Sequence, residues 1–165
     1  MIRAAATADA PRILALVTQA FGQDAEANLV DRLRASDRLT CELVAEECGV
    51  IVGHIAFSPV RIGDNSGAGL WWGLAPLAVA PASQKRGIGS TLVRTGLDAA
   101  RSAGASLVVV LGEPDYYGRF GFRPAEQLGL RCIYDVPREY FMACRPMPAT
   151  VPSGTVRYDE AFDGL

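Results

Sequence analysis

The sequence predicts a single domain of the mixed α/β class in an α+β layout, and three observations predict it. The chain of 165 residues has the length of one compact domain. Apolar residues recur at helical spacing near the N-terminus and then alternate with polar residues from about residue 40. Farther along, an apolar strand, an amphipathic helix and a second apolar strand follow one another, which is the order of a parallel crossover.

The N-terminal part predicts two helices. Apolar side chains recur every three or four positions over residues 13–21. Thr7 is expected to cap the start of this helix, and Gly22 is expected to end it. A second, shorter amphipathic helix is expected around residues 29–33.

A β-hairpin is predicted next. Residues 41–46 alternate between two faces, residues 47–49 suit a tight turn, and residues 50–58 form the second strand, which Pro59 stops. A loop rich in turn-forming residues follows at positions 63–69.

The middle of the chain predicts the crossover. Residues 70–79 form an apolar strand in which Pro76 indicates a bulge or an edge. A helix that starts near Gly87 and ends at Gly104 leads to residues 107–111, whose apolar β-branched run is typical of a strand buried on both faces.

The C-terminal third is less regular. A short helical turn with two tyrosines at positions 116 and 117 leads into a strand, residues 139–145 form the last clear strand, and residues 156–158 are expected to form a short edge strand. We expect residues 146–165 to be a proline-containing extension packed on a single domain that spans residues 1–165.

Composition excludes several functions. A net charge of −2 gives no overall attraction to nucleic acid or to anionic membranes. Neither a signal peptide nor a run of about 18 apolar residues is found, so a cytoplasmic protein is expected. The four cysteines form no C-x-x-C pair and His54 is the only histidine, which favours free thiols and no metal.

One segment carries a chemical signal, Gln-Lys-Arg-Gly-Ile-Gly-Ser at residues 84–90. It lies where a strand leads into a helix, and helix N-termini bind phosphate through unpaired N–H groups. Glycine lets an anion approach the backbone closely, and Lys85 and Arg86 add positive charge. These features predict a ligand that carries a diphosphate.

Two common phosphate-binding patterns fit this segment poorly. The P-loop needs Gly-Lys-Ser/Thr, whereas the only lysine precedes the glycines. The dinucleotide pattern G-x-G-x-x-G has Leu92 in place of its third glycine, although Glu113 lies at a distance that suits a ribose-binding acid. A dinucleotide-binding module therefore stays as an alternative, and it predicts NAD affinity greater than coenzyme A affinity.

The third pattern is Q/R-x-x-G-x-G/A, which Gln84, Gly87 and Gly89 match in full. It is the signature of the GCN5-related N-acetyltransferases (GNAT), and the order of elements resembles this family over nearly the whole chain. Residues 112–122 resemble the family's Tyr-x-x-x-Gly-Phe segment, and together with the tail at 154–162 they resemble its YhbS-like bacterial branch.

The resemblance implies a central, mostly antiparallel twisted sheet of six to seven strands with one parallel β-α-β crossover, flanked by about four helices. It also implies an enzyme that transfers the acetyl group of acetyl-CoA directly to a primary amine, without a metal. The implied cofactor-binding residues are Leu77, Ala78, Val79, Gln84, Lys85, Arg86, Gly87, Ile88, Gly89 and Ser90. Leu77 and Val79 would act through their backbone, pairing with the pantetheine arm as a strand would. A bulge at Pro76 would help to separate their strand from residues 107–111.

Tyr117 matches the family's usual catalytic tyrosine, a general acid that protonates the departing thiolate. A packing role is its rival interpretation, and packing is the expected role of Tyr116. The residues do not identify a general base. The candidates are water or one of Glu46, Glu47, His54, Glu113 and Asp115.

A non-catalytic acyl-CoA-binding regulator with the same fold is the main alternative function. The acceptor amine, a small molecule or a peptide, is not identified by the residues. We expect the first two helices and the loops at 63–69 and 127–138 to build its cleft. Homodimers are common in families of this type.

Overall fold

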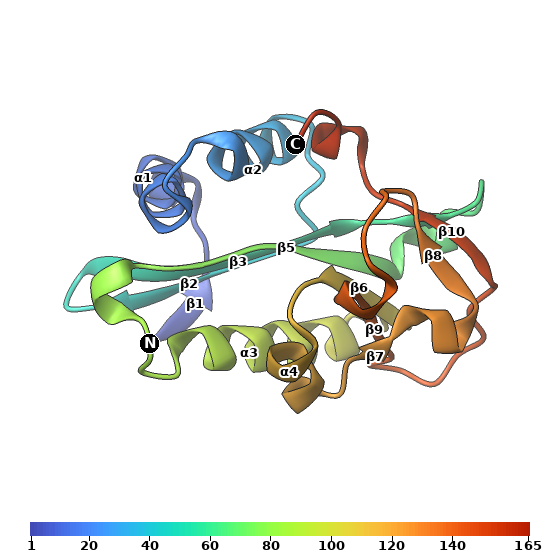
Figure 1. Cartoon of the computed structure of the whole chain (residues 1–165). Coiled ribbons are helices and arrows are strands. Elements are labelled where there is room, and N and C mark those ends of the chain that lie inside the picture. The colour runs from blue at the N-terminus through green and yellow to red at the C-terminus, as the bar shows by residue number, and fades with distance from the viewer.

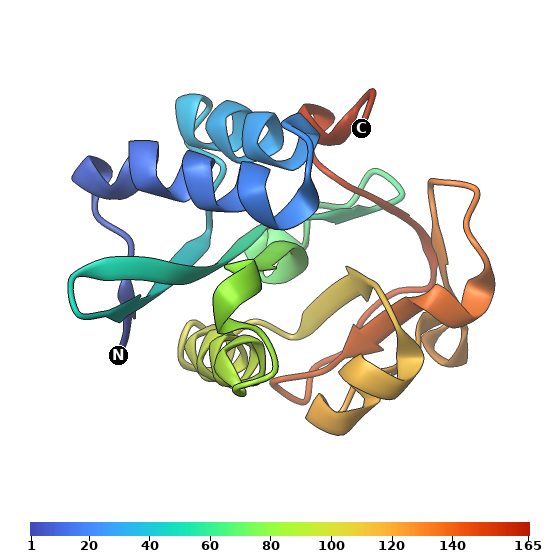
Figure 2. The same cartoon turned by 60° about the vertical axis from the view of Figure 1, so that its left-hand side comes forward.

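A seven-stranded sheet lies between two pairs of helices in the computed structural model, which describes residues 1–165 (Figure 1). The strand order is β1-β2-β3-β5-β6-β9-β7, and every neighbouring pair is antiparallel except β5 and β6. Helices α1 and α2 cover one face, and α3 and α4 lie on the other (Figures 1 and 2). The predicted fold class, with one parallel crossover, is confirmed. The strands of this sheet are β1 (Ile2–Ala4), β2 (Cys41–Glu47), β3 (Val50–Pro59), β5 (Trp71–Val79), β6 (Leu107–Leu111), β7 (Arg123–Pro124) and β9 (Phe141–Cys144), and the helices are α1 (Ala10–Phe21), α2 (Ala25–Ala35), α3 (Ile88–Ser102) and α4 (Pro114–Tyr117).

The first helix starts differently from the prediction. Thr7 begins a short 3-10 turn, and its side chain does not cap α1. Instead, the carboxylate of Asp9 accepts a hydrogen bond of 2.7 Å from the N–H of Ala6. Gly22 ends α1 as predicted, with φ +71°, because a residue without Cβ adopts this left-handed conformation at no steric cost.

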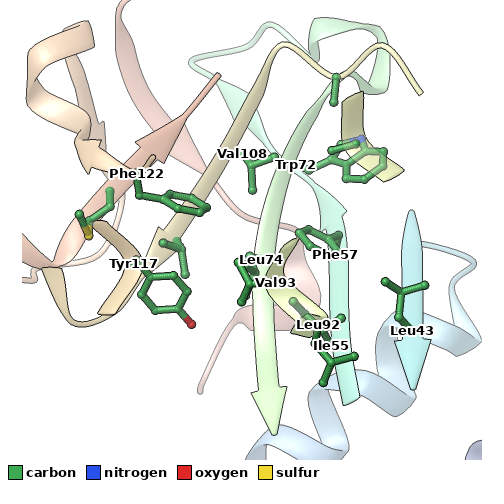
Figure 3. Packing of buried hydrophobic residues seen from close by; sticks show 14 of the residues in the cluster. Leu43, Ile55, Phe57, Trp72, Leu74, Leu92, Val93, Val108, Tyr117 and Phe122 are labelled. Atoms are coloured by element: carbon green, nitrogen blue, oxygen red, sulfur yellow. The ribbon is translucent and has the colours of Figure 1, made fainter. Parts of the chain in front are cut away.

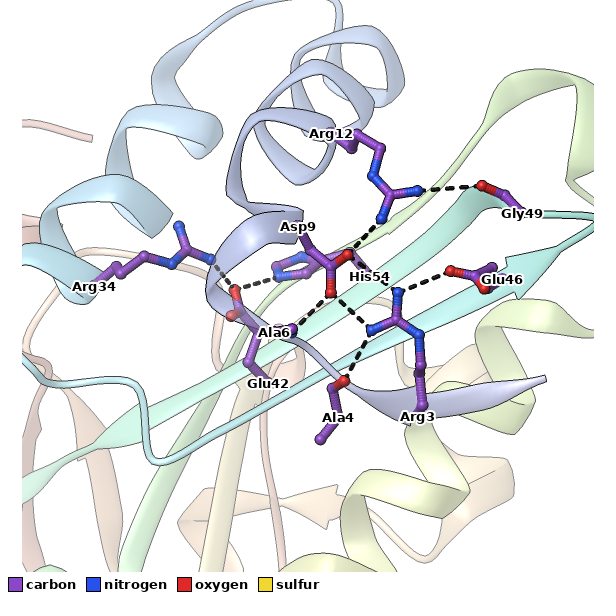
Figure 4. Close-up of polar contacts among 10 residues, drawn as sticks. All are labelled: Arg3, Ala4, Ala6, Asp9, Arg12, Arg34, Glu42, Glu46, Gly49 and His54. Carbon is purple, nitrogen blue, oxygen red and sulfur yellow. Dashed lines mark hydrogen bonds and ion pairs between the residues drawn. The ribbon is translucent and has the colours of Figure 1, made fainter.

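Asp9 also connects three elements, as Figure 4 shows. Its carboxylate accepts two hydrogen bonds from Arg3 on β1, at 2.7 and 3.1 Å, and one of 2.6 Å from Arg12 on α1. Arg3 reaches Glu46 on β2 as well, at 2.8 Å. The hydrogen bonds from Arg3 and Ala6 hold the pKa of Asp9 well below its usual range. The sequence did not predict β1, which is too short for any periodicity to be visible.

The core on the α3 face is formed by 16 buried side chains, several of which are labelled in Figure 3. Leu92 and Val93 of α3 are fully buried there. Gly96 lies against Phe57 of β3 so closely that a Cβ at this position would be 2.5 Å from the ring. The missing side chain therefore allows α3 to lie directly on the sheet.

A second, three-stranded sheet comes from the irregular part of the chain. Its order is β4 (Arg61–Ile62), β10 (Gly154–Arg157) and β8 (Leu130–Cys132). The final strand is therefore the middle strand of this sheet, and the expectation of an edge strand at residues 156–158 is wrong. The strand predicted at 139–145 is shorter, because residues 138–140 form a 3-10 turn before β9.

The four cysteines are free thiols. No cluster of three or more His, Cys, Asp or Glu side chains has a geometry that could hold a metal ion. None of the helices combines the length and the apolar character that crossing a membrane requires.

Candidate active site

Strands β5 and β6 pair only at their beginnings and then separate. The paired residues are 71–73 of β5 and 107–109 of β6. Between Leu74 and Leu77, β5 contains one residue more than β3 does between the partners Phe57 and Ile55. The bulge predicted at Pro76 is therefore present. Beyond it, the β5 edge at residues 74–79 offers unpaired backbone groups on the side of β6.

The glycine segment forms a turn at the N-terminus of α3, next to the end of β5. Lys85 and Gly87 both have positive φ, +64° and +83°. None of the backbone N–H groups of residues 85–90 donates a hydrogen bond to another group of the protein. A run of free N–H groups at the start of a 15-residue helix is an anion-binding arrangement.

A pocket of about 280 Å³ surrounds this turn. A Cβ on Gly89 would lie 2.9 Å from the hydroxyl oxygen of Tyr116, so the glycine leaves room between the helix and this ring. Arg119 donates a hydrogen bond of 3.2 Å to Ser90, and its guanidinium lies 4.6 Å from the centre of the Tyr116 ring. The pocket is lined by Val79, Ser83, Gln84, Lys85, Gly87, Ile88, Gly89, Ser90, Tyr116 and Arg119.

Sequence reasoning did not include three of these residues, Ser83, Tyr116 and Arg119. Tyr116 was expected only to pack, whereas its hydroxyl lies over the start of α3. No pattern in the sequence connects it to Gly89, which is 27 positions away. Arg119 lies two residues after the end of α4, and a single arginine at such a position is not distinctive in a chain with 15 arginines.

The other predicted binding residues divide into two groups. Lys85 forms no ion pair, so its ammonium is available to a ligand, whereas Arg86 binds Glu47 through two hydrogen bonds of 3.1 and 2.9 Å. The side chain of Gln84 donates to the carbonyl oxygen of Val79 at 3.1 Å. Gln84 therefore fixes the turn against the end of β5.

Tyr117 lies in the core on the α3 face, beside the point where the strands separate. Its ring meets Phe122 edge-on, with the ring centres 5.6 Å apart. Gly112 makes room for it, because a Cβ there would be 2.3 Å from the ring. Figure 3 shows its hydroxyl pointing away from Phe122 and toward the side of β5. Burial, and then the neighbouring Tyr116, raise the pKa of Tyr117 well above its ordinary value, so the phenol keeps its proton at neutral pH.

Three of the candidate bases are already bound to other groups. Glu46 accepts a hydrogen bond from Arg3, and Glu47 is paired with Arg86. His54 is fully buried, with its Nε2 2.9 Å from a carboxylate oxygen of Glu42 (Figure 4). The geometry thus favours a structural role for His54.

Glu42, which is half-buried, contacts both His54 and Arg34. Burial alone would raise the pKa of Glu42, but the hydrogen bond from His54 and the charge of Arg34, which lies 2.6 Å away, lower it below its ordinary value. The remaining candidates, Glu113 and Asp115, are exposed at the start of α4 and form no ion pair.

Comparison with known families decides the assignment. Residues 1–125 match the family model of the acetyltransferase (GNAT) domain. The chain belongs to the GNAT family. An N-acetyltransferase of Escherichia coli strain K12, YhbS, itself described as uncharacterized, is 40% identical over 167 aligned positions, which cover 99% of this chain and 98% of that protein. The resemblance to the YhbS-like branch is therefore confirmed.

Solved GNAT structures agree with this assignment. The crystal structure of E. coli YhbS in complex with CoA has a TM-score of 0.93 and 39% identity, and the match covers 99% of this chain and 91% of that one. A GNAT acetyltransferase of Brucella melitensis in complex with acetyl-CoA has a TM-score of 0.85 and 40% identity, with 99% and 97% coverage.

Proposed function

We propose that this GNAT protein binds acetyl-CoA and transfers its acetyl group directly to a primary amine. The observation that carries the proposal is the run of free N–H groups at residues 85–90 beside the unpaired edge of β5. Two relatives at about 40% identity were crystallised with CoA or acetyl-CoA. A ligand such as CoA needs free N–H groups for its diphosphate and, next to them, an unpaired strand edge for its amide-containing arm.

In this proposal the diphosphate accepts hydrogen bonds from the N–H groups at the start of α3. Lys85 adds positive charge, while Ser90 and Arg119 lie at the rim of the same pocket. The pantetheine arm pairs with the backbone of Leu77 and Val79, which have no strand partner on that side. The thioester then lies between β5 and β6, near Tyr117.

The transfer needs few protein groups. The neutral amine nitrogen attacks the thioester carbonyl carbon, an N–C bond forms, and the C–S bond breaks. Tyr117 donates its phenolic proton to the departing thiolate, which becomes the CoA thiol, and the proton that the amine loses returns to the phenolate through water or a carboxylate. The phenol of Tyr117, whose pKa burial raises above its ordinary value, is in its donor form over the whole neutral range.

The experiment compares turnover with binding. Wild type and Tyr117→Phe are incubated with acetyl-CoA and a panel of primary amines, and both released CoA thiol and acetylated amine are quantified. Loss of a general acid is expected to lower kcat by about 100-fold or more, while the Kd for acetyl-CoA stays within about twofold because the ring is kept.

Tyr140→Phe is the matched control, since it also removes a phenol hydroxyl, from a tyrosine that is 37% exposed. It is expected to turn over as the wild type does. Binding of acetyl-CoA without turnover of any amine would identify a non-catalytic regulator instead.

A further inference from the structure

A second pocket, of about 350 Å³, lies where β5 and β6 separate. Leu74 and Ala75, at the bulge of β5, form one side of it. Leu111, the last residue of β6, contributes from the other strand. The pocket therefore adjoins the position that the proposed function gives to the thioester. It is lined by Leu74, Ala75, Leu111, Tyr134, Val136, Tyr158, Phe162 and Leu165.

Aromatic rings from the C-terminal part of the chain form the opposite wall. Tyr134 stacks on Tyr158 with the ring centres 5.9 Å apart and the planes at 25°, and Tyr158 meets Phe162 at 5.0 Å. The loop at 127–138 contributes Tyr134 and Val136 to the lining. The first two helices and residues 63–69, which were also expected to build the acceptor cleft, contribute no residue to this pocket.

Helix α2 packs against the aromatic residues of this wall. Phe162 packs with Leu29 and Leu33 of α2. Arg32 donates two hydrogen bonds, of 2.7 and 3.1 Å, to the carbonyl oxygen of Ala161. The aromatic wall is therefore fixed to the rest of the fold, and a ligand that enters does not have to order it.

The charge around the pocket limits what can enter. All eight lining side chains are hydrophobic, and none of these side chains is charged. Burial, and then the negative charge of nearby Asp163, raise the pKa of Tyr134. The apolar lining matches a ring or a branched alkyl group better than a second, strongly hydrated ammonium group, and a carboxylate would be repelled by Asp163.

We propose that this pocket holds the carbon skeleton of the acceptor, which is a small primary amine bearing an aromatic or branched aliphatic group and no carboxylate. The inference rests on the proposed function, because it is the acetyl-CoA site that makes this pocket the acceptor site. Its volume and apolar lining are those of pockets that bind small organic molecules. Aromatic walls favour aromatic ligands through edge-to-face and stacked contacts.

Three probes test the inference with acetyl-CoA as donor: 2-phenylethylamine, phenylalanine and 1,4-diaminobutane. The first two differ only by a carboxylate, and the third replaces the ring with a second ammonium. We expect kcat/KM for 2-phenylethylamine to exceed that of either other probe by about 10- to 100-fold. Calorimetric titration of the protein–CoA complex with the same three amines measures their binding without turnover, and we expect the same order.

Leu111→Glu tests the position of the skeleton. Leu111 is 38% exposed, so the variant is expected to fold, and its carboxylate should lower kcat/KM for 2-phenylethylamine by about 10-fold or more while acetyl-CoA binding is kept. Ile133→Glu is the matched control, because Ile133 is 41% exposed and lies beside Tyr134 without lining the pocket. It should leave the selectivity unchanged.

Equal or better use of phenylalanine or 1,4-diaminobutane, absence of 2-phenylethylamine binding, or unchanged selectivity in Leu111→Glu would overturn the inference. Acetyl-CoA binding and acetylation of a polar amine in the same assays would show that the proposed function stands while this inference fails. Failure to bind acetyl-CoA would instead remove the proposed function.

Discussion

Tyr116 and Tyr117 are neighbours in one short helix, yet their side chains have different surroundings. Their rings are nearly perpendicular, at 83°, with Tyr116 directed at Gly89 and Tyr117 packed under Gly112. The position of Tyr117 before a Gly-Phe pair predicted its candidate role. The contact of Tyr116 depends on a distance across the fold, so nothing in its local sequence could predict it.

Asp9 gives a prediction at the same scale. Its pKa is lowered on folding, so its carboxylate contributes stability that is present above its unfolded pKa of about 3.9 and is lost as the pH falls toward the folded value. Asp9→Asn is therefore expected to lower Tm at neutral pH. The difference from wild type should narrow as the pH falls below about 4, because Asp9 of the unfolded wild-type chain is then protonated while Asp9 of the folded protein is still ionised.

Thermal unfolding of both proteins over this pH range measures the effect. Asp31→Asn serves as control, since Asp31 is exposed on α2 and forms no ion pair. It should follow the wild type at every pH. A Tm difference for Asp9→Asn that stays constant into acid would contradict the account.

At the scale of elements, α3 has two tasks. Its N-terminus presents free N–H groups, and its buried face rests on β3 and β5. The sequence predicted this helix and its direction because Leu92, Val93 and Leu97 recur at helical spacing. The distance between α3 and the sheet could not be predicted, because it depends on the contact between Gly96 and the ring of Phe57.

Gly96→Ala tests that contact. Alanine favours a helix by about 1 kcal/mol over glycine, but its Cβ would lie 2.5 Å from the Phe57 ring. Overpacking of this kind costs about 1–3 kcal/mol, so we expect a net loss in the free energy of unfolding of about 1 kcal/mol. In a Phe57→Leu background the same change should cost less or stabilise, because the obstructing ring atoms are gone. Urea unfolding of the four proteins measures the coupling, and strictly additive effects would argue against the contact.

At the scale of the whole molecule, elements defined by local sequence patterns could be predicted, whereas elements that depend on contacts between distant residues could not. The helices, the hairpin and the crossover were predicted because their apolar periodicity is local. The three-stranded sheet was not predicted, since β8 and β10 are only three and four residues long and pair in parallel across more than 20 positions. The aromatic pocket depends on that sheet and on the segment after it, so no local pattern in the sequence indicates its lining.

The same reasoning connects the two sites. The glycine segment is continuous in the sequence, so its candidate residues could be proposed from it alone. The acceptor pocket combines β5, β6, the loop after β8 and the segment after β10. A site assembled from four distant segments leaves no motif.

The most direct test of the central claim is calorimetric titration with acetyl-CoA and, separately, NAD. Gly87 and Gly104, near the two ends of α3, both have φ +83° and open space where a Cβ would lie. Gly87→Glu and Gly104→Glu thus introduce the same strain and the same charge, but only the first puts a carboxylate at the proposed diphosphate site. We expect the wild type and Gly104→Glu to bind acetyl-CoA more tightly than NAD, and Gly87→Glu to bind acetyl-CoA at least about 10-fold more weakly. Absence of acetyl-CoA binding, tighter NAD binding, or a Gly87→Glu variant that binds as the wild type does would contradict the account.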